Sequence, residues 1–220
     1  MIQPRGLFLW VAVGILTLGV SDSRADLLQE LSPAQQGEVR SGKQVTVLQE
    51  VPGEPWPRVT IYRIIPSTPG RVTAVFFDYK NAANYIPKVL KSVVSKDHSS
   101  SVTDVDYELS VPILPDEFYT VQNRLTRLPN GGYLISWHLL RAVQTKASTG
   151  EFRAVPYGKD TLLRYRILTT PSSGMAGILR GKAIDMIKDT VAAIAKEIEK
   201  QQVQDPAGLE KRVQALQAAL

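Results

Sequence analysis

The second half of the chain alternates apolar and polar residues with a period of two. Between Lys91 and Thr170, six such segments are separated by turn-forming sequences that include HSSS, PNGG and YGKD. In VTDVDYELSV the odd-numbered positions from Val105 to Val111 are apolar, and the even-numbered positions from Asp104 to Ser110 are polar. Because successive side chains of a strand point to opposite faces, this pattern predicts an antiparallel meander with one apolar face.

Another strand candidate precedes the meander. Residues 58–65, RVTIYRII, are mostly β-branched and aromatic, and Pro66 ends the run. Residues 26–57 contain the short strand candidate QVTVL and the turn sequence PGEPWPR, which predict a leader followed by an edge hairpin. We therefore expect a sheet of about seven strands.

Two short helices are predicted between residue 66 and the meander. Ser67 or Thr68 can cap the first helix, because Pro69 then occupies its first position and apolar residues follow at helical spacing. The second covers Asn81 to Tyr85 and is stopped by the nearby Pro87.

A long amphipathic helix is predicted after the meander, in GILRGKAIDMIKDTVAAIAKEIEKQQ. Charged residues surround an apolar stripe, which consists of Ile184, Ile187, Val191, Ile194 and Ile198. A sheet with one apolar face needs a cover, and this helix has the required length and pattern. The predicted fold class is α+β.

The C-terminal segment, residues 204–220, repeats apolar residues at helical spacing. These residues are Leu209, Val213, Leu216 and Leu220. Two interpretations remain open: the segment packs on its own domain, or it docks a protein partner or a membrane surface through its apolar stripe.

The first 25 residues have the pattern of a secretory signal peptide. Arg5 supplies a positive charge, residues 7–20 are an uncharged apolar run, and Ser23 and Ala25 are small residues before a cleavage point. A retained anchor is the alternative, but the run is shorter than the roughly 20 residues that span a bilayer. We expect cleavage after Ala25 and a periplasmic or secreted protein.

Composition narrows the chemistry. The chain has 44% hydrophobic and 21% charged residues, which is typical of a soluble globular domain, and it has no cysteine. The lack of cysteine excludes disulfides, lipid attachment through a thiol and thiolate chemistry. The formal net charge of +5 is not concentrated in Lys/Arg runs, so no nucleic-acid partner is expected.

Two segments resemble the SRPBCC superfamily of START-like and polyketide-cyclase/lipid-transport domains. IIPSTPGRVTAVFFDYKNAANYIPKVLKSVV is similar to the opening segment of that superfamily, and GEFRAVPYGKDTLLRY is similar to a later hairpin. The matching positions are Val72, Asp78, Tyr85, Pro87 and Val89, then Gly150, Phe152, Pro156, Thr161 and Tyr165. Phe152 stands where many relatives have Trp. The resemblance covers roughly residues 42 to 201.

The resemblance implies a helix-grip (START-like) fold over residues 58–203, with a hydrophobic cavity between the curved sheet and the long helix. Its motif residues belong to the scaffold, so no catalytic residue is carried over. The expected function is binding or transport of a lipid, isoprenoid or quinone, with transient membrane contact. One alternative is a cyclase or dehydratase in which Asp78, Asn123 or Tyr165 polarises a carbonyl. The other is an interaction module.

Candidate cavity residues are those that the pattern places on the apolar face of the sheet or on the helix stripe. They are Tyr107, Tyr119, Asn123, Trp137, Phe152, Leu163, Tyr165, Ile187 and Val191. Asn123 stands out because a buried amide must find a hydrogen-bond partner, either within the protein or on a ligand head group.

The remaining polar residues do not predict a metal or cofactor site. His98 and His138 are isolated and expected at the surface. Asp104, Asp106 and Glu108 alternate on one strand, where neighbouring carboxylates on the same face stand about 7 Å apart, so we expect a solvated face.

Overall fold

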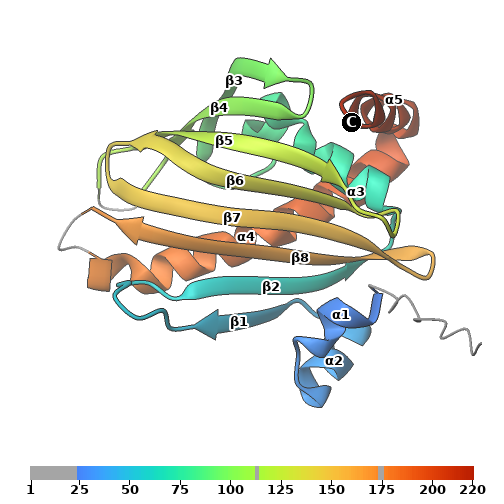
Figure 1. Ribbon diagram of the computed structural model, residues 1–220, viewed down its shortest axis with the longest axis horizontal. Coiled ribbons are helices and arrows are strands. Elements are labelled where there is room, and N and C mark those ends of the chain that lie inside the picture. The colour runs from blue at the N-terminus through green and yellow to red at the C-terminus, as the bar shows by residue number, and fades with distance from the viewer. Residues whose placement is uncertain (1–23, 112–113, 173–175) are drawn as a thin grey trace, which may run out of the picture.

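The computed structural model describes residues 24–111, 114–172 and 176–220. Eight antiparallel strands form one curved sheet in the order β1-β2-β8-β7-β6-β5-β4-β3 (Figure 1). The strands are β1 (Val45–Gln49), β2 (Arg58–Ile65), β3 (Val89–Ser99), β4 (Val102–Leu109), β5 (Glu117–Arg127), β6 (Tyr133–Ala142), β7 (Thr145–Tyr157) and β8 (Asp160–Pro171). The predicted meander is confirmed as β3 to β8. The eighth strand is β1, the short candidate QVTVL, which pairs with β2 at the edge.

Five α-helices and one 3₁₀ helix complete the described residues. They are α1 (Arg24–Gln29), α2 (Pro33–Arg40), α3 (Pro69–Phe77), η1 (Tyr79–Asn84), α4 (Ala176–Gln204) and α5 (Pro206–Ala218). Helix α4 is the predicted long helix, and it crosses one face of the sheet (Figure 1). The predicted signal peptide lies almost entirely outside the described residues. No helix within the described part of the chain is long and apolar enough to cross a membrane.

The start of α3 joins the two segments that carry the family resemblance. Thr68 is the N-cap residue, and its side chain accepts a hydrogen bond from the backbone N–H of Arg71. The preceding residue, Ser67, accepts a 2.6 Å hydrogen bond through its backbone carbonyl from the hydroxyl of Thr161, at the tip of the β7–β8 hairpin. This buried bond fixes the first helix against the hairpin.

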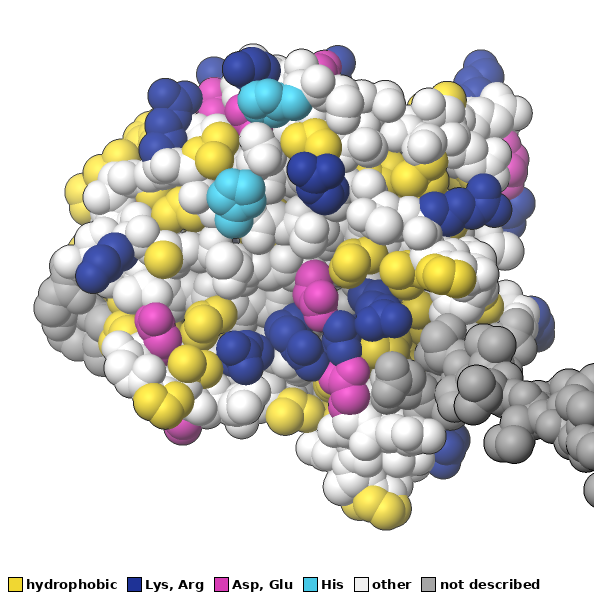
Figure 2. All heavy atoms as spheres, viewed as in Figure 1, with side chains coloured by type: hydrophobic (Ala, Val, Ile, Leu, Met, Phe, Trp, Pro, Cys, Tyr) yellow, Lys and Arg dark blue, Asp and Glu magenta, His cyan; other side chains and the backbone are white. Residues whose placement is uncertain are grey.

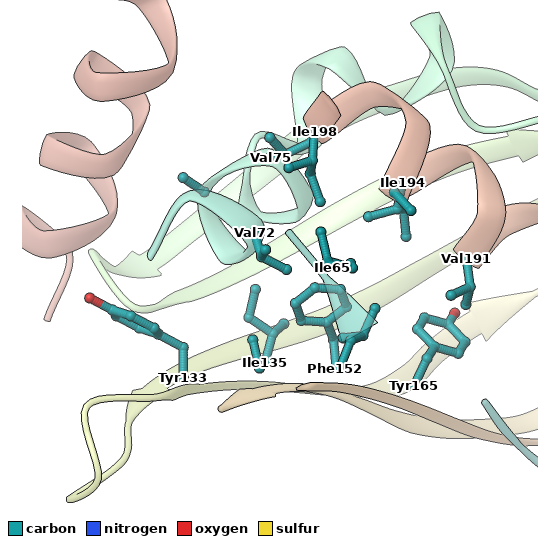
Figure 3. Close-up of a cluster of buried hydrophobic side chains, with 14 of the residues drawn as sticks. Ile65, Val72, Val75, Tyr133, Ile135, Phe152, Tyr165, Val191, Ile194 and Ile198 are labelled. Carbon is teal, nitrogen blue, oxygen red and sulfur yellow. The ribbon is translucent and has the colours of Figure 1, made fainter. Parts of the chain in front are cut away.

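The main hydrophobic core lies where α3 and the C-terminal half of α4 meet the inner face of the sheet (Figure 3). Val191, Ile194 and Ile198 of α4 are fully buried, as the apolar stripe predicts. Phe76 of α3 stacks on Phe152 of β7 with ring centroids 4.4 Å apart and nearly parallel planes. At this end the described side chains of the inner face are buried in the main core.

A second, smaller core lies on the outer face of the sheet, under α1 and α2. Its buried residues are Leu27, Leu28, Leu31, Val39, Val45, Tyr62, Val155 and Leu162. Between the helices and the sheet, Glu30 accepts hydrogen bonds from Arg164, Arg166 and Tyr62, and Arg164 also contacts Glu151. Figure 2 shows these opposite charges gathered beside α1. The leader is therefore an integral part of the domain.

The C-terminal helix α5 packs on α3. Leu209 and Leu216 are buried in the main core. Two ion pairs connect the helices: Arg71 donates to Glu210 at 2.7 Å, and Arg212 donates to Asp78 at 2.9 Å. Of the two interpretations of this segment, the structure supports packing on its own domain.

If α5 belongs to the core, Leu216→Ala will lower the free energy of unfolding by about 2–5 kcal/mol, because it removes buried methyl groups and leaves a cavity. Urea unfolding measures this change. Leu220→Ala is the matched control, since that side chain is 48% exposed and its loss should cost less than about 0.5 kcal/mol. Equal, small effects of both substitutions would contradict the packing of α5.

Candidate functional site: an apolar cavity under the long helix

A partly open cavity of about 270 Å³ lies between the inner face of the sheet and the N-terminal half of α4. Ala183, Met186, Ile187 and Thr190 of α4 line one side. Inward side chains of β4, β5, β6 and β8 line the other side, together with Phe76 of α3. Most of the lining surface is apolar.

The cavity begins where the packed core ends. Along β5 the inward positions are Tyr119, Val121, Asn123 and Leu125; the first three line the cavity, and Leu125 is buried in the core. Asn123 therefore marks the deep end. The other end is lined by residues next to the strand connections, such as Leu114, Gln144 and Pro171, at the left of Figure 1.

Six of the nine predicted cavity residues line this space. They are Tyr107, Tyr119, Asn123, Trp137, Tyr165 and Ile187. The prediction was wrong for Phe152, Leu163 and Val191, which are fully buried in the main core (Figure 3 shows Phe152 and Val191). Strand alternation predicts which face a residue occupies, but it does not predict how far along the strand the helices touch the sheet.

Several lining residues were not predicted. Leu139 lies on the apolar face of its strand, so the same alternation identifies it. Phe76 comes from α3, and its ring bridges the cavity and the core by contacting Trp137, Phe152 and Tyr165. Loop residues such as Trp56 and Pro87 carry no periodic signal, so only the tertiary structure places them at the cavity.

Paired aromatic rings form much of the wall. Tyr107 and Tyr119 are opposite each other on β4 and β5, and their rings stack with centroids 5.2 Å apart. The ring centroids of Trp137 and Tyr165 are 5.3 Å apart. The indole of Trp137 lies over Gly150, its neighbour on β7, where a Cβ atom would overlap the ring and come within 2.7 Å of the carbonyl oxygen of Arg166. A glycine in the hairpin motif thus lets the indole lie flat on the sheet.

The cavity contains neutral hydrogen-bonding groups at physiological pH. Burial raises the pKa of Tyr107 to about 12, and burial also raises the pKa of Tyr119 and of Tyr165. These phenols therefore stay protonated. Charged lining residues, Glu117 and Lys182, belong to the start of β5 and the N-terminal part of α4. Glu117 accepts hydrogen bonds from the backbone N–H groups of Val143 and Gln144.

Asn123 is the buried polar side chain at the deep end. Only 4% of the residue is exposed, and Nδ2 has no hydrogen-bond partner among the described residues. Thr103 and Trp137 are its neighbours on the adjacent strands. An unsatisfied buried amide donor costs about 1–3 kcal/mol, so this position is unfavourable unless a ligand supplies an acceptor.

The other polar candidates lie outside the cavity. His98 and His138 are exposed, as predicted. Asp104 is buried, which corrects the expected solvated face: it accepts hydrogen bonds from Gln122 and lies 2.8 Å from Nε2 of His98. Burial alone raises the pKa of this carboxyl, but those hydrogen bonds outweigh burial and lower it. Within the described ranges, no group of three His, Asp or Glu side chains converges on a metal position.

Asp78, one of the side chains of the enzyme alternative, ends α3 and does not line the cavity. Its carboxylate accepts hydrogen bonds from Asn81 at 2.7 Å and from Arg212 at 2.9 Å. These contacts give Asp78 a structural role at the end of α3.

Comparison with known proteins rests on structure alone. No family profile and no curated protein matches the sequence. A STAR-related lipid transfer protein from Xanthomonas axonopodis superimposes with a TM-score of 0.64 at 12% identity, covering 71% of this chain and 93% of that one. Human STARD10 superimposes with a TM-score of 0.58 at 13% identity, covering 74% of each chain.

A bacterial biosynthetic protein also matches. The Zhui aromatase/cyclase from a Streptomyces species has a TM-score of 0.52 at 18% identity, covering 68% of this chain and 97% of that one. These matches show that the chain has the START-like, helix-grip fold, which confirms the fold predicted from the two motifs. At sequence identities of 12% to 18%, these matches show a shared fold and nothing more.

Proposed function

We propose that this protein is located outside the cytoplasm, and that it binds and transports a hydrophobic small molecule in the cavity. The observation that carries the proposal is the partly open, mainly apolar cavity of about 270 Å³ beneath α4. Ligand pockets usually measure about 300–1,000 Å³, so the space suits a small ligand or one segment of a longer lipid. The names of the structural neighbours, a lipid transfer protein and an aromatase/cyclase, support a ligand of this kind.

Burial of apolar surface is sufficient for such binding. Each buried methylene contributes about 0.8 kcal/mol, so a chain of about ten methylenes gains roughly 8 kcal/mol before the costs of association. A carrier needs no catalytic group. A lipid, isoprenoid or quinone each supplies enough apolar surface.

The enzyme alternative has less support. A cyclase or dehydratase needs polar groups that act together on the substrate. Asn123 and Tyr165 line the cavity, whereas Asp78 is paired with Arg212 outside it. The geometry therefore favours a carrier over an enzyme.

Filling the cavity will test the carrier proposal. Ile187→Trp places a larger side chain into the space from α4, and we expect it to weaken binding of the apolar probe N-phenyl-1-naphthylamine at least tenfold in a fluorescence titration. Val203→Trp on the same helix is the control, because Val203 is 82% exposed, and it should leave binding unchanged. Probe binding that is equally strong in both variants would place the ligand elsewhere.

Export is part of the proposal. Leu27 and Leu28 follow the predicted cleavage point and are buried on the outer face of the sheet, so cleavage after Ala25 leaves the second core intact. Intact-mass measurement of the protein from its own host will then give a chain that begins at Asp26. A chain that retains the first 25 residues would contradict cleavage.

We also propose that the rim of the cavity contacts a membrane during ligand exchange. Phe118 and Val143 are 52% and 67% exposed, and each is adjacent in sequence to a lining residue. They line a surface hollow, where Figure 2 shows hydrophobic side chains among charged ones. Its charged lining residues are Lys91, Arg141, Asp106 and Glu108. Because the basic and acidic side chains balance, the exposed apolar side chains would make the contact with the bilayer interface.

A Phe118→Ser/Val143→Ser double variant tests the membrane proposal. We expect transfer of the naphthylamine probe between vesicles of phosphatidylcholine and phosphatidylglycerol to slow at least fivefold, while probe affinity in solution stays the same. Leu48→Ser, at an exposed position on edge strand β1, is the control. Equal transfer rates for all variants would rule out this surface.

A further inference from the structure

Among the described residues that line the cavity, Asn123 has a fully buried side-chain atom without a hydrogen-bond partner, its Nδ2. It lies at the deepest row of the cavity, between Thr103 of β4 and Trp137 of β6. The hydroxyl of Thr103 donates to Asp97 at 3.2 Å, and its oxygen accepts no hydrogen bond from Asn123 Nδ2. The Trp137 indole has a single N–H donor and no acceptor atom, so it cannot accept a hydrogen bond from the amide.

Burial makes this arrangement unfavourable. Nδ2 of Asn123 has almost no solvent contact and no partner among the described residues. A leucine of similar size would fill the same space without the desolvation cost of an amide. The amide therefore suits a protein whose bound ligand supplies the hydrogen-bond acceptor for Asn123 Nδ2.

The side chains around Asn123 determine which chemical class of acceptor can bind there. The side chains around the deep end are uncharged: Phe76, Val121 and Trp137 are apolar or aromatic, and burial keeps the Tyr165 phenol protonated. The charged lining residues Glu117 and Lys182 belong to the opposite part of the cavity. An ionised group at the deep end would lack a counter-ion in a desolvated site, which is strongly unfavourable.

We propose that Asn123 Nδ2 donates a hydrogen bond to a neutral carbonyl oxygen at the leading end of the ligand, and so selects ketones and esters over hydrocarbons and free carboxylates. This inference rests on the proposed carrier function. It identifies Asn123 as a specificity residue rather than a catalytic one.

Matched probes will test the selection. Valerophenone and pentylbenzene have nearly the same shape and differ in a carbonyl oxygen, and 4-butylbenzoate adds a negative charge. Displacement of N-phenyl-1-naphthylamine from the wild-type protein should show valerophenone binding at least fivefold more tightly than pentylbenzene, and 4-butylbenzoate binding most weakly. In Asn123→Leu the ratio of the first two affinities should fall to about one.

Two further variants make the result specific. Asn123→Val removes the donor and suits a strand, so it should also lose the preference for valerophenone; it serves as the second variant if Asn123→Leu does not fold. Gln122→Leu is the matched control, because this neighbouring amide donates to Asp104 at 3.0 Å outside the cavity, and it should keep the preference. The infrared carbonyl frequency of bound valerophenone should be lower in the wild type than in Asn123→Leu.

The outcomes separate the two proposals. If the naphthylamine does not bind the wild-type protein, the carrier function is wrong. If valerophenone and pentylbenzene bind with equal affinity, or if Asn123→Leu keeps the wild-type ratio, the role of Asn123 is wrong and the carrier function stands.

Discussion

The packing of α4 against one face of a curved sheet is the interaction on which the rest of the structure depends. Its C-terminal half inserts Val191, Ile194 and Ile198 into a closed core, and burial of these side chains attaches the helix to the sheet. Its N-terminal half faces strands of the same sheet across an open space. One helix therefore serves both as the stabilising cover and as one wall of the cavity.

The boundary between core and cavity is made by aromatic side chains. Phe76 stacks on Phe152 on the core side and contacts Trp137 on the cavity side. The two sequence motifs maintain this boundary, because the Thr161 hydroxyl binds the start of α3 and Gly150 leaves space for the indole of Trp137. Among the residues that carry the superfamily resemblance, Thr161 and Gly150 thus act on the shape of the cavity without lining it, whereas Pro87, Val89 and Tyr165 form part of its wall.

Periodicity along the chain predicts much of the fold. The period of two identified the meander and the inner face, and the apolar stripe identified α4, because each pattern follows directly from backbone geometry. The distance along each strand at which the helices close onto the sheet depends on tertiary packing, so Phe152 and Leu163 were misplaced. The contact of Glu30 with Arg164, more than a hundred residues apart, and the burial of Asp104 carry no local signal.

Native mass spectrometry of the protein purified from its own host, without detergent, tests the central claim most directly. The account predicts a polypeptide with an apolar molecule bound non-covalently, which organic solvent extracts and which an excess of a carbonyl-containing lipid replaces. A bare polypeptide that takes up no member of a broad lipid panel, while its fold is intact, would contradict it.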